Sequence, residues 1–171
     1  MHKRWFVPSA VALSLTLFVG ALAQGGHDDD ERRLRARLSG FEETPAVSTV
    51  ARGDFKGMIS RDGSEITYRL SYTGLEAPVR FAHIHLGQKG VSGSVVAFLC
   101  GGGSKPACPQ DGSVEGTIVA ADVIGPSAQG IDPGELGEFL RAIRRGVTYA
   151  NVHSDKFPGG EIRGQIKTND D

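Results

Sequence analysis

Three histidines in this chain have the residue type and spacing that a metal site needs. His83 and His85 are separated by one residue in the run 81–86, and His153 ends the run 147–153. Side chains on a strand alternate between its two faces, so positions i and i+2 project from one face, about 6.6 Å apart along the chain. If the strand ending at His153 lies beside the other two histidines, three imidazoles converge. They then form either a metal site or a hydrogen-bonded polar cluster.

Both interpretations are chemically reasonable. Three imidazoles, with water or Glu161 as a fourth ligand, suit zinc or copper. Neutral imidazoles are the binding form, so binding is expected above about pH 6.5, the ordinary pKa of histidine. Alternatively, the histidines are partly buried and bonded to Glu161, Asn151 or the backbone, as buried polar groups normally are.

Polar residues occupy one face of each of three predicted strands. Asn151 shares a face with His153, and Glu161 shares one with Arg163 two residues later. The opposite faces of these strands carry alanine, valine, leucine and isoleucine, which indicates a core on that side. Glu43 lies in a loop segment that can fold over a strand end. The sequence therefore predicts a polar cluster around the histidines that contains Glu43, Asn151, Glu161 and Arg163.

The pattern along the chain is that of an all-β domain. Short stretches with period-two alternation are separated by Gly, Pro, Asn and Asp, and the chain has 24 glycines. Asp62-Gly63 is a strong hairpin signal between two of them. No βαβ rhythm, G-x-G-x-x-G motif or P-loop is present, which excludes the common nucleotide-binding folds. Strands are expected at residues 34–38, 55–60, 65–73, 79–86, 94–100, 113–119, 147–153 and 161–166.

One short helix is predicted before the penultimate strand. Asp132 is a good N-cap, Pro133 suits the first helical position, and Glu135 completes a capping-box arrangement. Apolar residues then follow at helical spacing from Leu136, and Gly146 closes the helix. The expected fold is an antiparallel β-sandwich or barrel of about eight strands with this helix inserted.

The N-terminal residues predict export of the protein. Residues 1–23 have a basic start, an apolar stretch and a small-x-small site ending at Ala23, which is typical of a signal peptide. The alternative is an uncleaved membrane anchor, although the stretch is short for a bilayer span of about 20 residues. Residues 24–33 form an acidic flexible tail, whose cluster at His27 is interpreted as solvated, and residues 34–168 form the β domain. No membrane span is expected after cleavage.

Cys100 and Cys108 are the two cysteines of the chain. The glycine-rich stretch between them is flexible enough to bring the thiols together, and an oxidising compartment favours a disulfide. A metal-binding or redox pair is the rival interpretation, but it lacks the C-x-x-C spacing.

The formal net charge is −1, and no basic stripe with interleaved aromatics is visible, so no nucleic-acid partner is expected.

Four segments, taken together, resemble the CHRD domain, a module named after chordin. They are residues 38–45, 82–87, 149–154 and 157–165, and in order and spacing they span most of the chain after the tail. The family often has a second proline after Thr44, and threonine is usual at Ser154. The resemblance implies an all-β extracellular domain, found alone or repeated in exported bacterial proteins and within animal chordins. Those animal proteins antagonise bone-morphogenetic growth factors, but this chain lacks their accompanying cysteine-rich modules.

The His83-Ile84-His85 strand is also similar to the copper-ligand strand of copper/zinc superoxide dismutases, which are β-barrels with a disulfide. That family holds copper with four histidines, whereas this chain offers His83, His85 and His153 besides the tail residue His27. No second histidine group with an aspartate marks a zinc loop. The similarity therefore covers the histidine strand alone.

Two functional hypotheses follow. The first is an exported, non-enzymatic CHRD-type binding or structural module whose partner is a protein, an envelope component or a matrix component. The second is a copper- or zinc-binding metalloprotein with His83, His85 and His153 as ligands. No catalytic residue and no cofactor-binding residue are identified. No cysteine is free for nucleophilic catalysis if the disulfide forms, and no serine has a nucleophile-elbow glycine pattern around it.

Overall fold

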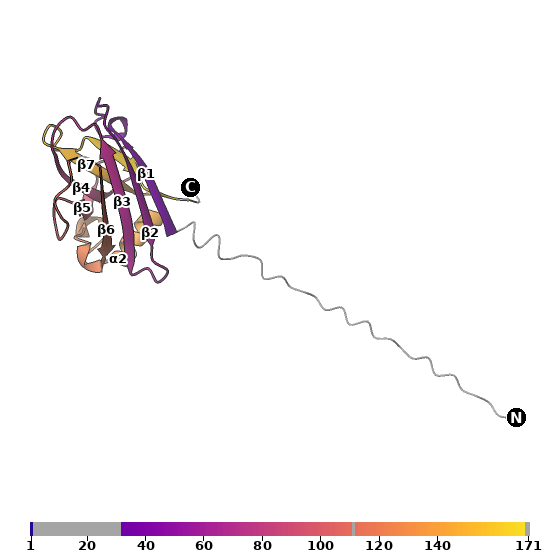
Figure 1. Cartoon of the computed structure of the whole chain (residues 1–171). Helices are drawn as coiled ribbons and strands as arrows, with labels where there is room; N and C mark the ends of the chain where they lie inside the picture. Colours follow the sequence, from indigo (N-terminus) through magenta and orange to yellow (C-terminus); the bar gives the residue numbers. More distant parts are fainter. Residues whose placement is uncertain (2–31, 111, 170–171) are drawn as a thin grey trace.

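The computed structural model describes Met1 and residues 32–110 and 112–169, so the predicted signal peptide and most of the acidic tail lie outside the described residues. Strands are the main regular structure of the described chain, together with one α-helix and three 3-10 turns (Figure 1). In chain order the elements are β1 (Arg33–Ser39), η1 (Gly40–Glu42), β2 (Arg52–Ile59), β3 (Glu65–Thr73), β4 (Val79–Leu86), β5 (Ser94–Cys100), β6 (Gly112–Val119), η2 (Ala120–Asp122), η3 (Ser127–Gln129), α2 (Leu136–Arg144), β7 (Thr148–Ser154), β8 (Ile162–Gln165) and β9 (Lys167–Thr168).

The strands form one antiparallel sheet that curls into a nearly closed barrel. Their order is β5-β4-β7-β8-β1-β2-β3-β6, and β9 pairs with β1 beside β8. The edge strands β5 and β6 lie near each other, and the Tyr68 hydroxyl on β3 donates to the Leu99 carbonyl on β5 across 2.6 Å. Ile124, after β6, donates to Val96 of β5, so part of this edge is covered by the chain itself. The predicted all-β fold with one inserted helix is confirmed.

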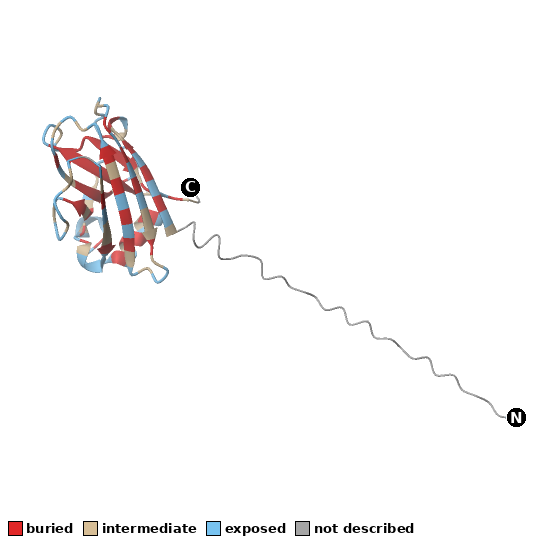
Figure 2. Cartoon of the chain, viewed as in Figure 1, coloured by how far each residue is buried: buried red, intermediate tan, exposed pale blue. Residues whose placement is uncertain are grey.

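The barrel interior is the main apolar core. Alternate residues of β1, β2 and β3 point inward, and Figure 2 shows the resulting alternation of buried and exposed positions along these strands. The core is filled mainly by β-branched, leucine and phenylalanine side chains. The largest of them, including Phe55, Ile84, Phe139 and Ile162, are fully buried. Burying each such side chain contributes about 1.5–3 kcal/mol, so this interior is the principal source of stability.

Strand β7 differs from β1–β3 because every one of its residues is buried. Ala150 and Val152 face the core, while Tyr149, Asn151 and His153 occupy the other face. That outer face is covered by the β1–β2, β4–β5 and β7–β8 loops. The fold therefore has a second buried layer, which is polar and aromatic, between the sheet and its loops.

The helix begins later than the sequence predicts. It spans Leu136–Arg144, whereas the capping pattern predicts Pro133 as the first helical residue. Gly134 has a φ of +89°, a left-handed conformation that breaks the helix before it starts. Part of the predicted capping arrangement is present nonetheless, because the Glu135 carboxylate accepts the Asp132 N–H at 3.0 Å. Gly146, at φ +64°, follows the C-terminal end as expected.

The predicted disulfide between Cys100 and Cys108 is confirmed. It closes the turn after β5 at a sequence separation of 8 residues.

No helix within residues 32–110 and 112–169 has the length and apolar character that crossing a bilayer requires.

Removing the disulfide should lower stability without changing the fold. In the chain-entropy relation, a loop of this size accounts for about 2–3 kcal/mol, because the cross-link restricts the unfolded chain. Denaturant unfolding of a Cys100→Ala/Cys108→Ala variant should show a loss of that size, with the barrel's circular dichroism unchanged. A midpoint and slope equal to those of the wild type would contradict the prediction.

Candidate functional site

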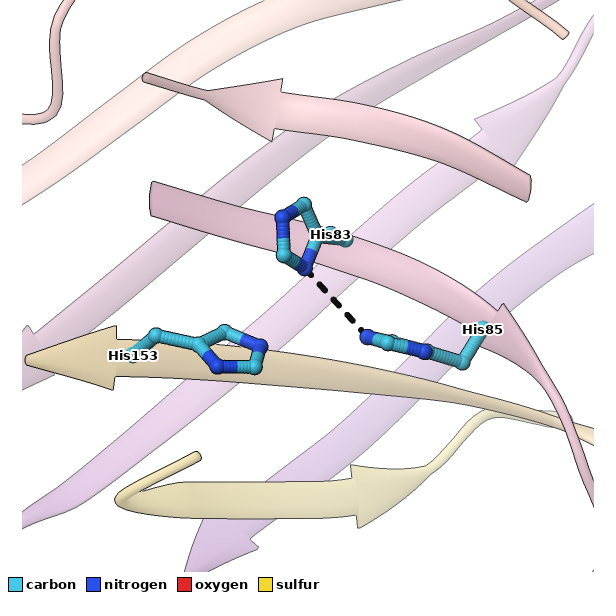
Figure 3. A group of neighbouring side chains, drawn as sticks. All are labelled: His83, His85 and His153. Carbon is cyan, nitrogen blue, oxygen red and sulfur yellow. Dashed lines mark hydrogen bonds between the residues drawn. The ribbon is translucent and has the colours of Figure 1, made fainter. Parts of the chain in front are cut away.

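The three predicted histidines do come together. His83 and His85 lie on β4, and β7 pairs with β4 so that Phe81 is opposite His153 and His83 is opposite Asn151. All three rings project from the outer face of the sheet into the buried layer, with 5–7% of each residue exposed. One ligand nitrogen from each ring lies within 4.8 Å of the other two. Figure 3 shows these nitrogens facing a common point between the two strands.

In the rings of His85 and His153, backbone carbonyls determine which nitrogen keeps its lone pair for a ligand. The Nδ1 atoms of His85 and His153 lie 3.0 Å from the carbonyls of Gly93 and Pro158, respectively. A carbonyl can only accept, so in each neutral ring Nδ1 carries the proton and Nε2 carries the lone pair. His85 Nε2 lies 3.3 Å from His83 Nδ1, which donates to it when protonated. His153 Nε2 is buried and has no hydrogen-bond partner.

Aromatic rings enclose the histidines. Phe81 stacks on His83 with ring centroids 4.7 Å apart, and Phe98 meets the same imidazole edge-on at 4.6 Å. Tyr149 lies parallel to His85 at 4.8 Å. These rings exclude water from the imidazole edges and hold their orientation. Phe81 also lies 4.9 Å from the His153 ring, centroid to centroid, and the unpaired Nε2 of His153 is buried.

Burial keeps the imidazoles neutral. It is the main reason why the pKa of His83 falls to about 3 and that of His153 to about 4, and it also lowers the pKa of His85. Neighbouring imidazoles lower the first two pKa values further. The rings are therefore available as ligands well below pH 6.5, the limit expected from ordinary histidine.

Arg163 is the cation of the buried layer, and it ties two loops to the barrel. It lies on β8 opposite Asn151, with 4% of the residue exposed. Its Nε donates to the Glu42 carbonyl at 2.5 Å, Nη1 to the Val91 carbonyl at 3.2 Å, and Nη2 to the Thr44 hydroxyl. Its guanidinium also lies 4.6 Å from the centroid of the Tyr149 ring. One side chain thus holds the β1–β2 and β4–β5 loops beside the histidine group.

Glu43 and Asn151 form a second polar pair next to Arg163. A Cβ added to Gly160 would lie 2.6 Å from Glu43 Oε1 and 2.9 Å from Asn151 Oδ1, so both oxygens crowd the same small space. Both are buried without a hydrogen-bond partner. Burial raises the pKa of Glu43 to about 7, against the lowering influence of Arg163 and the Thr44 backbone N–H. At neutral pH a pKa near 7 leaves part of the Glu43 carboxyl protonated, and a protonated carboxyl can donate a hydrogen bond.

The structure does not bring Glu161 onto the histidines. Its Oε1 accepts from the Thr49 hydroxyl at 3.0 Å and the Glu76 N–H at 2.9 Å, and its Oε2 accepts from the Ser154 hydroxyl at 2.5 Å. The carboxylate thus anchors the β1–β2 and β3–β4 loops. The expected polar cluster is divided: Glu43, Asn151 and Arg163 adjoin the histidine layer, and Glu161 forms its own network.

Several neighbours of the histidines are not singled out by the sequence. The positions of Phe81 and Tyr149 beside the histidines could have been predicted from strand alternation, because each is two positions from a residue already assigned to the polar face. Phe98 and the carbonyls of Gly93 and Pro158 depend on strand register and loop conformation. No local pattern in the sequence indicates them.

Glu43→Gln should change how stability depends on pH. In the wild type the carboxyl has a higher pKa folded than unfolded, so its contribution is complete below about pH 4.5 and lost as pH rises through about 7. The glutamine side chain stays neutral at every pH, so the variant should gain stability relative to the wild type as pH rises above about 4.5. The difference should level off above about pH 7, at up to about 3 kcal/mol. Denaturant unfolding of both proteins from pH 4 to 8 measures the difference. A pH-independent difference would contradict the assignment.

Comparison with known proteins identifies the family to which this arrangement belongs. The CHRD domain matches residues 34–166, which runs from the second residue of β1 through β8 and includes every residue of the site described above. A search of curated proteins found no match, and a search of solved structures found none either. The match covers well over half of the chain and agrees with the resemblance seen in its sequence motifs. This chain belongs to the CHRD domain family.

Proposed function

We propose that this domain is an exported, non-enzymatic metal-binding module that holds one copper ion through His83 Nδ1, His85 Nε2 and His153 Nε2. The observation that carries the proposal is the buried, unpaired Nε2 of His153 facing the other two ligand nitrogens. A buried polar atom without a partner costs about 1–3 kcal/mol, and a metal ion bound to His153 Nε2 would remove that cost. The disulfide is in keeping with an oxidising compartment.

The ligand spacing is close to what a metal requires. Imidazole ligands lie about 2.0–2.1 Å from zinc, so in tetrahedral or trigonal sites their nitrogens are about 3.3–3.6 Å apart. His83 Nδ1 and His85 Nε2 already meet this requirement at 3.3 Å. All three nitrogens lie within 4.8 Å of one another, so a shift of about 1 Å by the His153 ring would bring them to the spacing that a metal requires. The carbonyls behind His85 and His153 act as the outer hydrogen-bond partners that orient metal-binding imidazoles.

Charge favours copper over zinc. The grouped ligand atoms are three neutral imidazoles, with no carboxylate or thiolate among them. Burying a divalent ion there leaves two uncompensated charges, and Arg163 nearby adds positive potential to His85. A cuprous ion, which is monovalent, leaves one uncompensated charge. In the divalent series, copper also binds nitrogen ligands more tightly than zinc does.

Metal analysis of protein purified without a histidine tag tests the proposal. The wild type should carry one copper per chain, and His85→Ala should bind at least about 100-fold more weakly. Because burial keeps the pKa values of His83 and His153 near 3 and 4, wild-type binding should persist at about pH 5.5.

His27→Ala is the matched control, because it removes one histidine outside the described residues. It should retain full copper binding, while apo His85→Ala should keep the wild-type circular dichroism. Equal loss of copper from His27→Ala would assign the metal to the acidic tail. A wild type that takes up neither copper nor zinc would refute the metal site.

A second candidate function, a binding module for a protein or matrix partner, is favoured by the loops themselves. Phe41 is 73% exposed, Val50 80% and Val91 48%, and all three lie in the two loops that Arg163 holds. Exposed apolar side chains on fixed loops are suited to contact a partner. In this interpretation the histidine layer is structural and Arg163 shapes the contact surface.

Arg163→Lys tests whether the loops depend on this one side chain. Lysine keeps the charge but cannot reach three acceptors with fork geometry, so stability should fall by about 2–4 kcal/mol. Limited proteolysis should also cut faster within residues 40–51. Arg80→Lys, at an exposed position, should change stability by less than about 0.5 kcal/mol. Equal proteolysis of both variants would show that other contacts hold the loops.

A further inference from the structure

Four cations form a continuous row across the outside of the barrel, on strands that do not carry the histidines. Lys167 of β9 is paired with Arg35 of β1, Arg35 with Lys56 of β2, and Lys56 with Arg69 of β3. All four residues are exposed. Adjacent strands are about 4.8 Å apart, so the row spans about 15 Å. Arg37, also exposed, lies two positions along β1 on the same face.

This arrangement opposes folding. Directly opposite side chains in an antiparallel pair have their Cβ atoms about 4.5–5.5 Å apart, and like charges there are destabilising. The row contains three such pairs in succession. Arg69 is compensated by Glu115 of β6 at 2.5 Å. Across the described residues, Arg35, Lys56 and Lys167 have no carboxylate within ion-pairing distance.

The uncompensated cations also border a hollow. A groove of about 550 Å³ lies over β1, β2 and β9, lined by Arg35, Arg37, Lys56 and Lys167. Asp54, opposite Arg37, is the one acidic residue in its lining. The formal charge of the whole chain is −1, so this concentration of positive charge does not reflect a basic protein. A concave site with several free cations raises the local concentration of anions.

We infer that this groove binds a linear anionic polysaccharide, a sugar chain bearing carboxylate or sulfate groups. The cation row pairs with the successive anionic groups of such a chain. The Asp54 carboxylate accepts hydrogen bonds from sugar hydroxyls, which polymers of phosphate alone do not offer. This surface is separate from the proposed copper site and does not depend on it.

Other polyanions fit the face less well. Proteins that bind single-stranded nucleic acid stack bases on aromatic rings, and none of the exposed large hydrophobic side chains of the described chain lies on β1, β2, β3 or β9. A rigid duplex presents phosphates on a convex surface that meets only the rim of a groove. A lipid surface is flat, and its peripheral binders add apolar anchors beside the cations.

The test is a binding titration of the full chain with defined probes. These are polygalacturonate as the carboxylated chain, heparin as the sulfated chain, neutral dextran, double-stranded DNA, and phosphatidylglycerol-containing vesicles. Wild-type protein should bind one or both acidic polysaccharides but not dextran. Affinity should weaken steeply between about 50 and 200 mM salt, because the contacts are ionic.

Paired variants assign the binding to the row. Lys56→Gln/Lys167→Gln should weaken polysaccharide binding by about tenfold. Its melting temperature should equal or exceed that of the wild type, because the variant relieves like-charge repulsion. Arg80→Gln/Lys156→Gln removes the same charge at exposed cations that Asp155 and Glu76 already compensate. Affinity should change less than twofold in this control.

Any of four results would overturn the inference. Three are no binding of either acidic polysaccharide at about 50 mM salt, equal weakening in the two variant pairs, and tighter binding of DNA or vesicles than of the polysaccharides. A folded row variant with unchanged affinity would likewise exclude the groove as the site.

Discussion

The burial of β7 on both faces is the constraint on which the rest of this molecule depends. A strand covered on one side by the core and on the other by loops cannot leave polar groups to water. Each polar side chain on its outer face must therefore find a partner in the protein or in a ligand. The same holds beside β7: Arg163 of β8 donates to the carbonyls of two covering loops, and Glu161, just before β8, accepts the Glu76 N–H of a third segment. The loops lie where they do because these buried charges need them.

The same constraint makes each buried atom without a hydrogen-bond partner significant, because water cannot reach it. In the described residues, four buried side-chain atoms have no hydrogen-bond partner, belonging to Glu43, Thr148, Asn151 and His153. A proton on Glu43 would give its carboxyl a hydrogen to donate, and the Asn151 oxygen borders the same space beside Gly160. No comparable protein donor within the described chain faces the His153 Nε2, and adding a proton to that ring would bury a charge. In the metal-bound form proposed above, the ion would accept the lone pair of this nitrogen.

Sequence reasoning predicted the strands, the helix, the disulfide and the histidine group because each depends on local pattern. His83 and His85 share a face by period two alone, and their meeting with His153 needed only the pairing of two strands. The division of the polar cluster could not be predicted, since Glu161 turns toward Thr49, 112 residues away in the chain. The late helix start depends on the conformation of Gly134, which a capping pattern does not reveal.

The cation row was invisible in the sequence for a related reason. Its members are distributed over four strands, so no single segment of the chain contains them, and only the register aligns them. That register is set by the core, because Ala36 and Phe55 must face inward and thereby turn Arg35 and Lys56 outward. The core would pack as well with uncharged residues at these outer positions. Repulsion that packing does not require must be explained by something outside the fold, which is why the row is interpreted as a binding surface.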